Sequence, residues 1–376
     1  MKRIKPILTT GLLFLFLCGI SGLQAADYKT KKSYKEWPRE ASKFAEAFYR
    51  TDEARRIGEN VLLYQLESGG WPKNIYIPEE LTPDERKKAE TGKSDVRRGT
   101  IDNRATTTEI HYLAKLYNAT GDSRYRDAAI HGIDYLLEAQ YDNGGWPQFY
   151  PKATGYHVQI TFNDNAMINV MQLLRDVARQ KTPYTFLPDS TATAARRAFQ
   201  KGIGCILACQ VKQNGQPSVW CAQHDRRTLA PCKARAYELP SLSGAESVNI
   251  TLLLMSLPQP DSTVVQAVEG AVAWFRKTAI TNLKREDFTN AQGEKDFRMV
   301  KTADAPRIWA RFYEVETNRP FFCGRYGVKK YRVEDIEYER RNGYSWYNRA
   351  PEKVLEQYDQ WKKRNMRYKK HPGRKT

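Results

Sequence analysis

The sequence has few cysteines, little alternation of the strand type and only one apolar stretch that approaches the length of a membrane span. The absence of further apolar stretches excludes a protein with several membrane spans. No CxxC pair occurs among the six cysteines, which argues against a structural zinc site. Acidic residues are also few, since 43 Asp and Glu stand against 61 Lys and Arg, for a net charge of +18.

The remaining composition is that of a folded protein that binds an anionic partner. Hydrophobic residues make up 41% and charged residues 28% of the 376 residues, which argues against disorder and leaves room for one large core. Aromatic residues are plentiful, with 22 Tyr and 8 Trp. A basic and aromatic surface suits nucleic acid or an acidic polysaccharide.

The first 26 residues have the pattern of an export signal. Three of the first five residues are basic, an apolar run follows, and the segment ends at the small residues Ala25 and Ala26. We predict a signal peptide over 1–26 and a periplasmic or secreted mature protein; an uncleaved membrane anchor is the alternative. Cleavage leaves five cysteines, so at least one thiol stays free, and the spacing leaves a Cys221–Cys232 disulfide open.

Helical periodicity dominates the rest of the chain. Apolar residues recur at helical spacing in 122–140, 194–207 and 264–275. Helix-start signals support this prediction, because Ser243 with Glu246 and Thr82 with Glu85 have the spacing of capping boxes. Asp261 is a candidate N-cap, Pro83 suits a first helical position, and Pro351 is placed to open a final amphipathic helix.

A repeat of 70 to 75 residues divides this helical chain. LLYQLESGGWPK (62–73) returns as LLEAQYDNGGWPQ (136–148), and a weaker copy is ILACQVKQNGQPSVW (206–220). Each copy has a helix end, a glutamine, a glycine turn and a Trp, and the repeated glutamines are Gln65, Gln140 and Gln210. Helical hairpins of this length stack because none buries its apolar face alone. We predict an all-α fold, an α/α toroid with long irregular loops that form a cleft.

The expected domain organisation is a single catalytic toroid over 27–376. Within it, 78–99 is predicted to be an inserted charged loop with a short helix, and 369–376 a basic tail. Toroids gather their helix-end loops around one mouth, so the GGWP turns are candidate rim elements and Trp146 a candidate substrate-binding residue. The alternative is that Trp71 and Trp146 only staple their helix ends.

Two segments place Asp beside Asn at an expected helix start. They are TIDNRATTTEI, with Asp102 and Asn103, and ITFNDNAM, with Asp164. The simple interpretation is N-capping. Taken together, the carboxylate and amide oxygens suit Ca²⁺, and two carboxylates would offset the unfavourable helix dipole. No continuous EF-hand loop occurs, so such a site must be assembled from distant segments.

Two further segments carry candidate ligands for an anionic substrate. The irregular stretch 220–250 contains His, Asp, Arg, Tyr and Glu side chains that we expect at a cleft, namely His224, Asp225, Arg235, Tyr237 and Glu238. The stretch 307–327 contains four arginines, whose forked donors bind carboxylates in two-point geometry. Arg307 and Arg311 are spaced for one helix face, and we favour Arg307 and Arg325 as ligands.

At these segments the sequence resembles the pectate lyases of polysaccharide lyase family 10. The resembling blocks run in order from about Leu62 to Tyr331: GGWPKN, IDNRATTTEI, YDNGGWPQFYP, ITFNDNAM, WCAQHD, ARAYELPSLSGAES and RIWARFYE with CGRYG. The resemblance implies an α/α toroid, an exported enzyme, Ca²⁺ as cofactor and cleavage of polygalacturonate by β-elimination. Three departures, at Arg104, Gln159 and Tyr326, concern substrate preference and rate more than the reaction.

The resemblance also implies residue roles. Metal binding falls to Asp102, Asn103 and Asp164, and proton abstraction to Arg235, with carboxylate binding by Arg307 and Arg325. An arginine base is chemically unusual because Arg keeps its proton far above neutral pH, although neighbouring cations would lower its pKa. Lys233 and Tyr237 are alternative bases, and we also count both, with His224, among the substrate-binding residues.

Other functions remain open from the residues alone. A uronide hydrolase would need two carboxylic acids, for which Glu238, Asp225, Glu109 and Glu246 are candidates. A non-catalytic protein that binds acidic polysaccharide would use the aromatics and arginines without turnover. No recognisable motif supports nucleic-acid binding, and the export signal opposes it. We therefore expect a monomer that acts on polygalacturonate, without a nucleic-acid or membrane partner.

Overall fold

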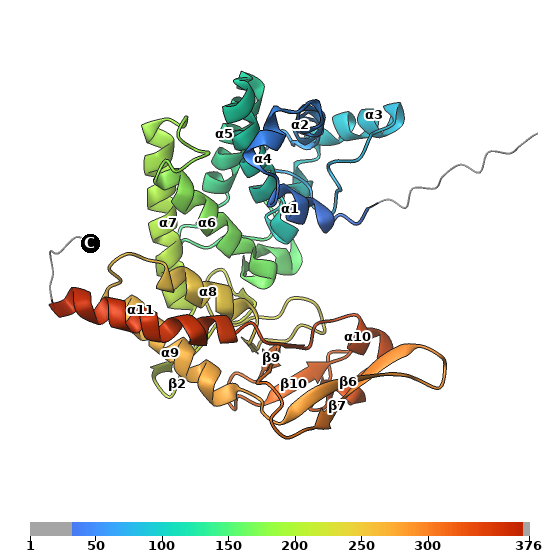
Figure 1. Cartoon of the computed structure of the whole chain (residues 1–376), viewed down its shortest axis with the longest axis vertical. Helices are drawn as coiled ribbons and strands as arrows, with labels where there is room; N and C mark the ends of the chain where they lie inside the picture. Colours follow the sequence, from blue (N-terminus) through green and yellow to red (C-terminus); the bar gives the residue numbers. More distant parts are fainter. Residues whose placement is uncertain (1–31, 371–376) are drawn as a thin grey trace, which may run out of the picture. The chain divides into compact units, whose positions relative to one another are not determined.

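Stacked helical hairpins build most of the chain (Figure 1). The computed structural model describes residues 32–370, so the predicted signal peptide and the end of the basic tail lie outside the described residues. The α-helices are α1 (Glu36–Ala41), α2 (Asp52–Tyr64), α3 (Pro83–Thr91), α4 (Thr107–Thr120), α5 (Ser123–Glu138), α6 (Ala166–Ala178), α7 (Asp189–Cys209), α8 (Glu246–Met255), α9 (Ser262–Thr278), α10 (Tyr338–Asn342) and α11 (Glu352–Lys370).

Three hairpins lie side by side in the order of the sequence. Helix α4 packs on α5, α6 on α7, and α8 on α9. The first helices of the hairpins, α4, α6 and α8, also contact one another in succession, as do the second helices, α5, α7 and α9. Helix α2 packs on α4 and α5 at one end of the stack, and α11 packs on α8 and α9 at the other. The predicted all-α class and α/α toroid are confirmed.

The repeated glutamines join each hairpin to the next. Gln65 donates from Nε2 to the carbonyl of Ala128 on α5, and Gln140 donates to the carbonyl of Ala198 on α7, over 2.9 and 2.8 Å. Gln210 does the same to a carbonyl of α9. Each Nε2 also bonds its own following turn. These paired bonds hold the turn that ends one helix and fix how far the next hairpin can slide along it.

The repeated tryptophans are staples. Trp71, Trp146 and Trp220 are fully buried, and each ring nitrogen donates to a carbonyl of the preceding helix. For Trp146 the acceptor is Leu136, 2.7 Å away. The prediction that Trp146 binds substrate is therefore wrong, because a ring with no exposed surface and a satisfied nitrogen has nothing to offer a sugar.

The helix-start signals behave as the sequence predicts, with one exception. Thr82 and Glu85 form a complete capping box for α3, the short helix expected within 78–99. Asp261 caps α9 by accepting from the backbone nitrogen of Val264 at 2.9 Å. Ser243 accepts from the nitrogen of Glu246 and its hydroxyl donates to the Glu246 carboxylate, whose other oxygen contacts Arg311, while the Ser243 backbone nitrogen donates to the Trp220 carbonyl, so the capping box is not completed.

The strand content of the last third was missed. The strands are β1 (Ile160–Thr161), β2 (Lys212–Gln213), β3 (Gln216–Pro217), β4 (Gln223–His224), β5 (Leu242–Ser243), β6 (Leu283–Thr289), β7 (Lys295–Lys301), β8 (Trp309–Ala310), β9 (Phe312–Tyr313), β10 (Pro320–Cys323), β11 (Lys329–Lys330) and β12 (Tyr347–Asn348). Strands β6 and β7 form a hairpin of seven residue pairs. A separate four-stranded sheet has the order β11-β10-β9-β5. No helix in the described part of the chain is long and apolar enough to cross a membrane.

This strand-rich segment corrects one helical prediction. Arg307 and Arg311 do not share a helix face, because the chain is extended through β8 and β9. A second apolar core of aromatic side chains holds the segment together, with Phe297, Phe312, Phe321, Phe322 and Trp346 at its centre. The short strands escape detection because two to four residues are too few to show alternation.

Replacing Gln140 by Ala tests the hairpin connection. The substitution removes two hydrogen bonds and leaves the carbonyls of Gly144 and Ala198 without this donor. We expect the free energy of unfolding to fall by about 2 kcal/mol, measured by urea denaturation. The exposed Gln200→Ala on α7 is the control, and equal stability of the two variants would contradict the connecting role.

Candidate active site

Two strained turns precede the neighbouring helices α4 and α6. They are single 3₁₀ turns, Asp102–Arg104 and Asn163–Asn165. Asn103 and Asp164 lie in the left-handed region, with φ of 52° and 51°. Neither helix start receives a side-chain cap, so the capping interpretation of these residues is wrong. Non-glycine residues in this region cost free energy that is usually tolerated for a functional reason.

The stacked hairpins bring the carboxylates of these turns together. Asp102 is buried, with Oδ2 2.5 Å from the Lys73 ammonium, while Oδ1 is buried without a hydrogen-bond partner among the described residues. Burial raises the pKa of Asp164, and the charges of Glu246 and Asp102 raise it further while the guanidinium of Arg311 opposes them. Three carboxylates at the starts of α4, α6 and α8 thus share one electrostatic environment.

Arg311 is the cation that organises this environment. It follows β8, is largely buried, and donates from one terminal nitrogen to Glu246 at 2.7 Å and to Asn163 at 3.1 Å. The same nitrogen lies 3.9 Å from Asp164. Burial alone would lower the pKa of Arg311, but Glu246, Tyr344, Asp164 and Glu238 together raise it. Arg311 therefore stays charged beside the two strained turns.

The predicted base lies in a second group of side chains next to this one. Arg235 forms a two-point ion pair with Glu238, at 2.8 and 2.5 Å, and stacks over the ring of Tyr237. The hydrogen bond to Glu238 raises the pKa of Arg235 above its ordinary value. Burial raises the pKa of Tyr156, Arg235 lowers it, and Glu238 and Asp102 raise it further, so Tyr156 lies within electrostatic reach of both groups.

Arg325, like Arg235, has its guanidinium group near the ring of Tyr237. Its guanidinium stands 4.9 Å from the ring centre of Tyr237, and its carboxylate partner is Glu339 at 3.0 and 2.5 Å. The loop that carries it lies against the backbone beside Arg235, since a Cβ on Gly327 would come within 2.7 Å of the Ala236 carbonyl oxygen. Tyr326 at the tip of this loop is 87% exposed, which leaves its ring available to a ligand.

Two predicted substrate ligands lie apart from these groups. Arg307 forms its ion pair with Glu352 on α11, at 3.1 and 2.8 Å, and none of its contacts with the described residues reaches Asp164. His224 is fully buried, and both ring nitrogens are engaged by the backbone of Cys221 and Leu229. Burial lowers the pKa of His224 to about 4, so a substrate-binding role for this neutral structural ring is wrong.

The structure also bears on Lys233 and on the Cys221–Cys232 disulfide. Lys233 is exposed in the loop before Arg235, and its role stays a prediction. The five cysteines of the described chain are all free thiols, so a Cys221–Cys232 disulfide is not formed.

Sequence reasoning missed Arg311, Tyr344, Tyr156 and Lys73 as members of the site. No signal in the sequence distinguishes Arg311 from Arg307, because the bend between β8 and β9 decides which arginine turns inward.

The donors around Asp102 and Asp164 fit a hard cation in part. No group of three His, Cys, Asp or Glu side chains with metal-holding geometry occurs among the described residues. Two carboxylates and the Asn103 amide are nevertheless at hand, and the unpartnered Oδ1 of Asp102 is the kind of oxygen that Ca²⁺ takes. An adjoining cavity of about 410 Å³ is lined by Asn103, Arg104, Asp164 and Asn165 and, opposite them, by residues 34–42. It has room for further oxygen ligands.

Comparison with known proteins identifies this arrangement. The pectic acid lyase family matches residues 65–355. A solved family 10 polysaccharide lyase from Cellvibrio cellulosa is 35% identical, with 86% of this chain and 95% of that chain covered and a TM-score of 0.71. An aspartate-to-alanine mutant of that family's enzyme from the same organism, in complex with trigalacturonic acid, is 34% identical, with 86% and 96% covered and a TM-score of 0.70. No curated protein sequence gives a significant match.

The chain therefore belongs to the pectic acid lyases, polysaccharide lyase family 10. Within that class it is a pectate lyase, an enzyme that degrades pectin. The predicted family and enzyme class are confirmed.

Replacing Arg311 by Met tests its place in the site. Removing one partner of a buried ion pair leaves Glu246 uncompensated, so we expect a loss of about 3–5 kcal/mol in the free energy of unfolding. The exposed pair of Arg307 is the control, and Arg307→Met should cost about 1 kcal/mol or less. Denaturant titration measures both.

A double variant separates the structural from the functional role of Arg311. Arg311→Met with Glu246→Leu removes both charges, and it should recover most of the stability lost in the single variant. Activity on pectate should stay below a hundredth of the wild-type value, because the cation beside Asp164 is gone. A double variant that is both stable and active would exclude Arg311 from the active site.

Proposed function

We propose that the enzyme cleaves polygalacturonate by Ca²⁺-assisted β-elimination and releases oligogalacturonides with a 4,5-unsaturated end. The observation that carries this proposal is the meeting of Asp102 and Asp164, on strained turns, beside the charged Arg311. That a related enzyme forms a complex with trigalacturonic acid supports a uronide as the substrate. The basic net charge of +18 would steer a polyanion toward the site.

Asp102, Asn103 and Asp164 are the residues that would hold the cation. Bound there, Ca²⁺ would neutralise the uronide carboxylate, which acidifies the neighbouring C5 hydrogen and favours the charge that develops on elimination. Arg311 supports the same charge from its place between Glu246 and Asn163. Lys73 now compensates Asp102 and would have to share that carboxylate with the cation.

Proton removal from C5 falls to Arg235, followed by departure of the C4 oxygen. The ion pair with Glu238 opposes this role, because it holds the guanidinium in its charged form. For Arg235 to take the C5 proton, its guanidinium must part from Glu238 and enter the reaction deprotonated, since another carboxylate in the place of Glu238 would hold it charged as well. Lys233, exposed two residues earlier, is the alternative base.

The acids that a hydrolase would need are engaged elsewhere. Glu238 and Glu246 are held by Arg235 and Arg311, and Glu109 is buried with its carboxylate on the Trp37 ring nitrogen. Asp225 accepts from the backbone of its own turn. Inverting and retaining hydrolases both need two carboxyl groups open to the scissile bond. This arrangement favours elimination over hydrolysis.

Export completes the proposal. The first 26 residues have the pattern of a signal peptide. We propose a periplasmic or secreted enzyme whose mature chain begins just after Ala25 or Ala26, which the intact mass of the exported protein would show.

Ultraviolet absorbance during incubation with polygalacturonate tests the reaction. We expect a rising conjugated-ene signal that needs added Ca²⁺, disappears with a chelator and falls at least a hundredfold in Asp164→Ala, since that carboxylate holds the cation. Asp84→Ala, which removes an exposed carboxylate on α3, is the control and should behave as wild type.

Each other outcome of this assay points to a different function. New reducing ends without absorbance would establish a hydrolase. Binding of the polymer with neither product would indicate a non-catalytic polysaccharide-binding protein. A full signal in the chelator would overturn the Ca²⁺ requirement while leaving the lyase intact.

Replacing Glu238 by Gln tests the base. The carboxylate raises the pKa of Arg235, so its removal lowers that pKa, and the deprotonated fraction at a given pH grows. If Arg235 is the base, the rising limb of the pH–kcat profile moves to lower pH and turnover at pH 7 increases several-fold. Glu339→Gln, which frees Arg325 in the same way, is the control and should leave the limb in place. An unmoved limb in Glu238→Gln would favour Lys233.

A further inference from the structure

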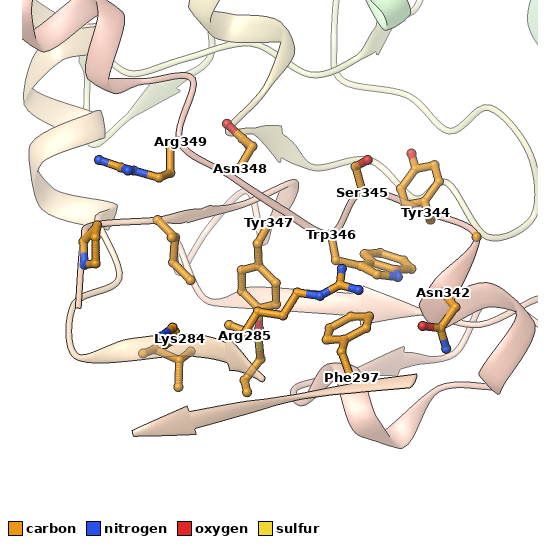
Figure 2. A pocket seen from close by; sticks show the side chains of 15 residues that line it. Lys284, Arg285, Phe297, Asn342, Tyr344, Ser345, Trp346, Tyr347, Asn348 and Arg349 are labelled. Atoms are coloured by element: carbon orange, nitrogen blue, oxygen red, sulfur yellow. The ribbon is translucent and has the colours of Figure 1, made fainter. Parts of the chain in front are cut away.

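A second pocket lies in the strand-rich segment, apart from the turns Asp102–Arg104 and Asn163–Asn165. It has a volume of about 590 Å³ and lies between the β6–β7 hairpin and residues 342–349, which run from the end of α10 through β12 (Figure 2). Its size falls within the range of small-molecule binding sites. The pocket is lined on one side by Lys284, Arg285 and Phe297 and on the other by Trp346 and Arg349.

The charge of this pocket is entirely positive. Its lining includes Lys284, Arg285 and Arg349 and no acidic residue. Arg285 has a carboxylate partner in Asp287, two residues along the same strand. Lys284 and Arg349 are exposed and form no ion pair with any residue of the described range 32–370. Two available cations facing one pocket favour an anionic ligand.

The floor of the pocket is aromatic. The Arg285 guanidinium lies 4.0 Å from the ring centre of Phe297 and reaches toward Trp346, as Figure 2 shows. Phe297 and Trp346 are themselves buried, so the ring surface open to a ligand is that of the half-buried Tyr344 and Tyr347. An aromatic surface packs against the C–H face of a sugar ring, while cations at its edge contact a carboxylate on that ring. A uronate residue presents both features.

Tyr344 connects this pocket to the active site. It lines the pocket, and its ring also carries the Arg311 guanidinium at 4.5 Å and that of Arg340 at 3.8 Å. Tyr344 therefore borders both the pocket and the Arg311 guanidinium that lies beside Asp164. A polymer bound in both places would gain affinity through the high effective concentration of its second segment.

We propose that this pocket is an ancillary uronate-binding site, which holds a part of the acidic polysaccharide that is not being cleaved. The proposal rests on the proposed substrate class but not on the elimination chemistry. Lys284 and Arg349 contact the uronate carboxylates, and the half-buried rings of Tyr344 and Tyr347 support the sugar.

The double variant Lys284→Ala/Arg349→Ala tests this site. Both side chains are exposed, so folding should be unaffected. We expect KM for long polygalacturonate to rise about fivefold to tenfold with kcat unchanged, as the loss of two exposed charge contacts predicts. On galacturonate oligomers of increasing length, KM of the variant should match that of wild type for oligomers too short to reach the pocket and exceed it for longer ones. Lys295→Ala/Lys301→Ala removes two charges from the same hairpin outside the pocket and is the control.

Direct binding separates this proposal from the proposed reaction. Affinity electrophoresis in polygalacturonate, with chelator present to prevent turnover, should show weaker retardation of the Lys284→Ala/Arg349→Ala variant than of wild type and control. This result would stand even if no elimination were detected. Equal retardation of the variant and the control would overturn the ancillary site. An equal loss of binding to polyaspartate would also overturn it, because it would show attraction to any polyanion rather than a uronate site.

Discussion

The glutamine bond from each hairpin to the next is the constraint on which the active site depends. Gln65, Gln140 and Gln210 each tie the end of one hairpin to a carbonyl of the following one. Because these bonds fix the relative height of α5, α7 and α9, they also fix the starts of α4, α6 and α8. The carboxylates at those starts come from positions 102, 164 and 246, and they can meet only if the stack is held in this register.

The stack thereby places three carboxylates close enough to repel one another. Helix N-termini favour anions, which is why three carboxylates can gather there, yet their mutual repulsion raises the pKa of Asp164 beyond the effect of burial. Lys73 and Arg311 offset part of this repulsion. Positive φ at Asn103 and Asp164 shows that the turns are held against their local preference. The proposed divalent cation would relieve the remaining charge.

The sequence allowed the helical stack to be predicted more fully than the site. Repeated Gln and Trp residues and helical periodicity depend on local spacing, and local spacing is visible in the sequence. The pairing of Asp102 with Asp164 followed from two similar segments. The sequence did not indicate that Arg311, rather than Arg307, lies beside Asp164. The bend between the two-residue strands β8 and β9 determines which arginine points inward. Burial removed His224 and Trp146 from the cleft, and burial depends on contacts distant in sequence.

The arginines of the site share one energetic feature that bears on how a polyanion binds. Arg235, Arg311 and Arg325 are each paired with a carboxylate of the protein, and Tyr237 and Tyr344 support their guanidinium groups. A uronide that binds the exposed Arg235 and Arg325 would exchange with their carboxylate partners, so each new ion pair would replace an existing one and the net gain per contact would be small. Useful affinity then requires several such exchanges along one chain. A polymer with one carboxylate on every residue would meet that requirement, which is consistent with polygalacturonate as the proposed substrate.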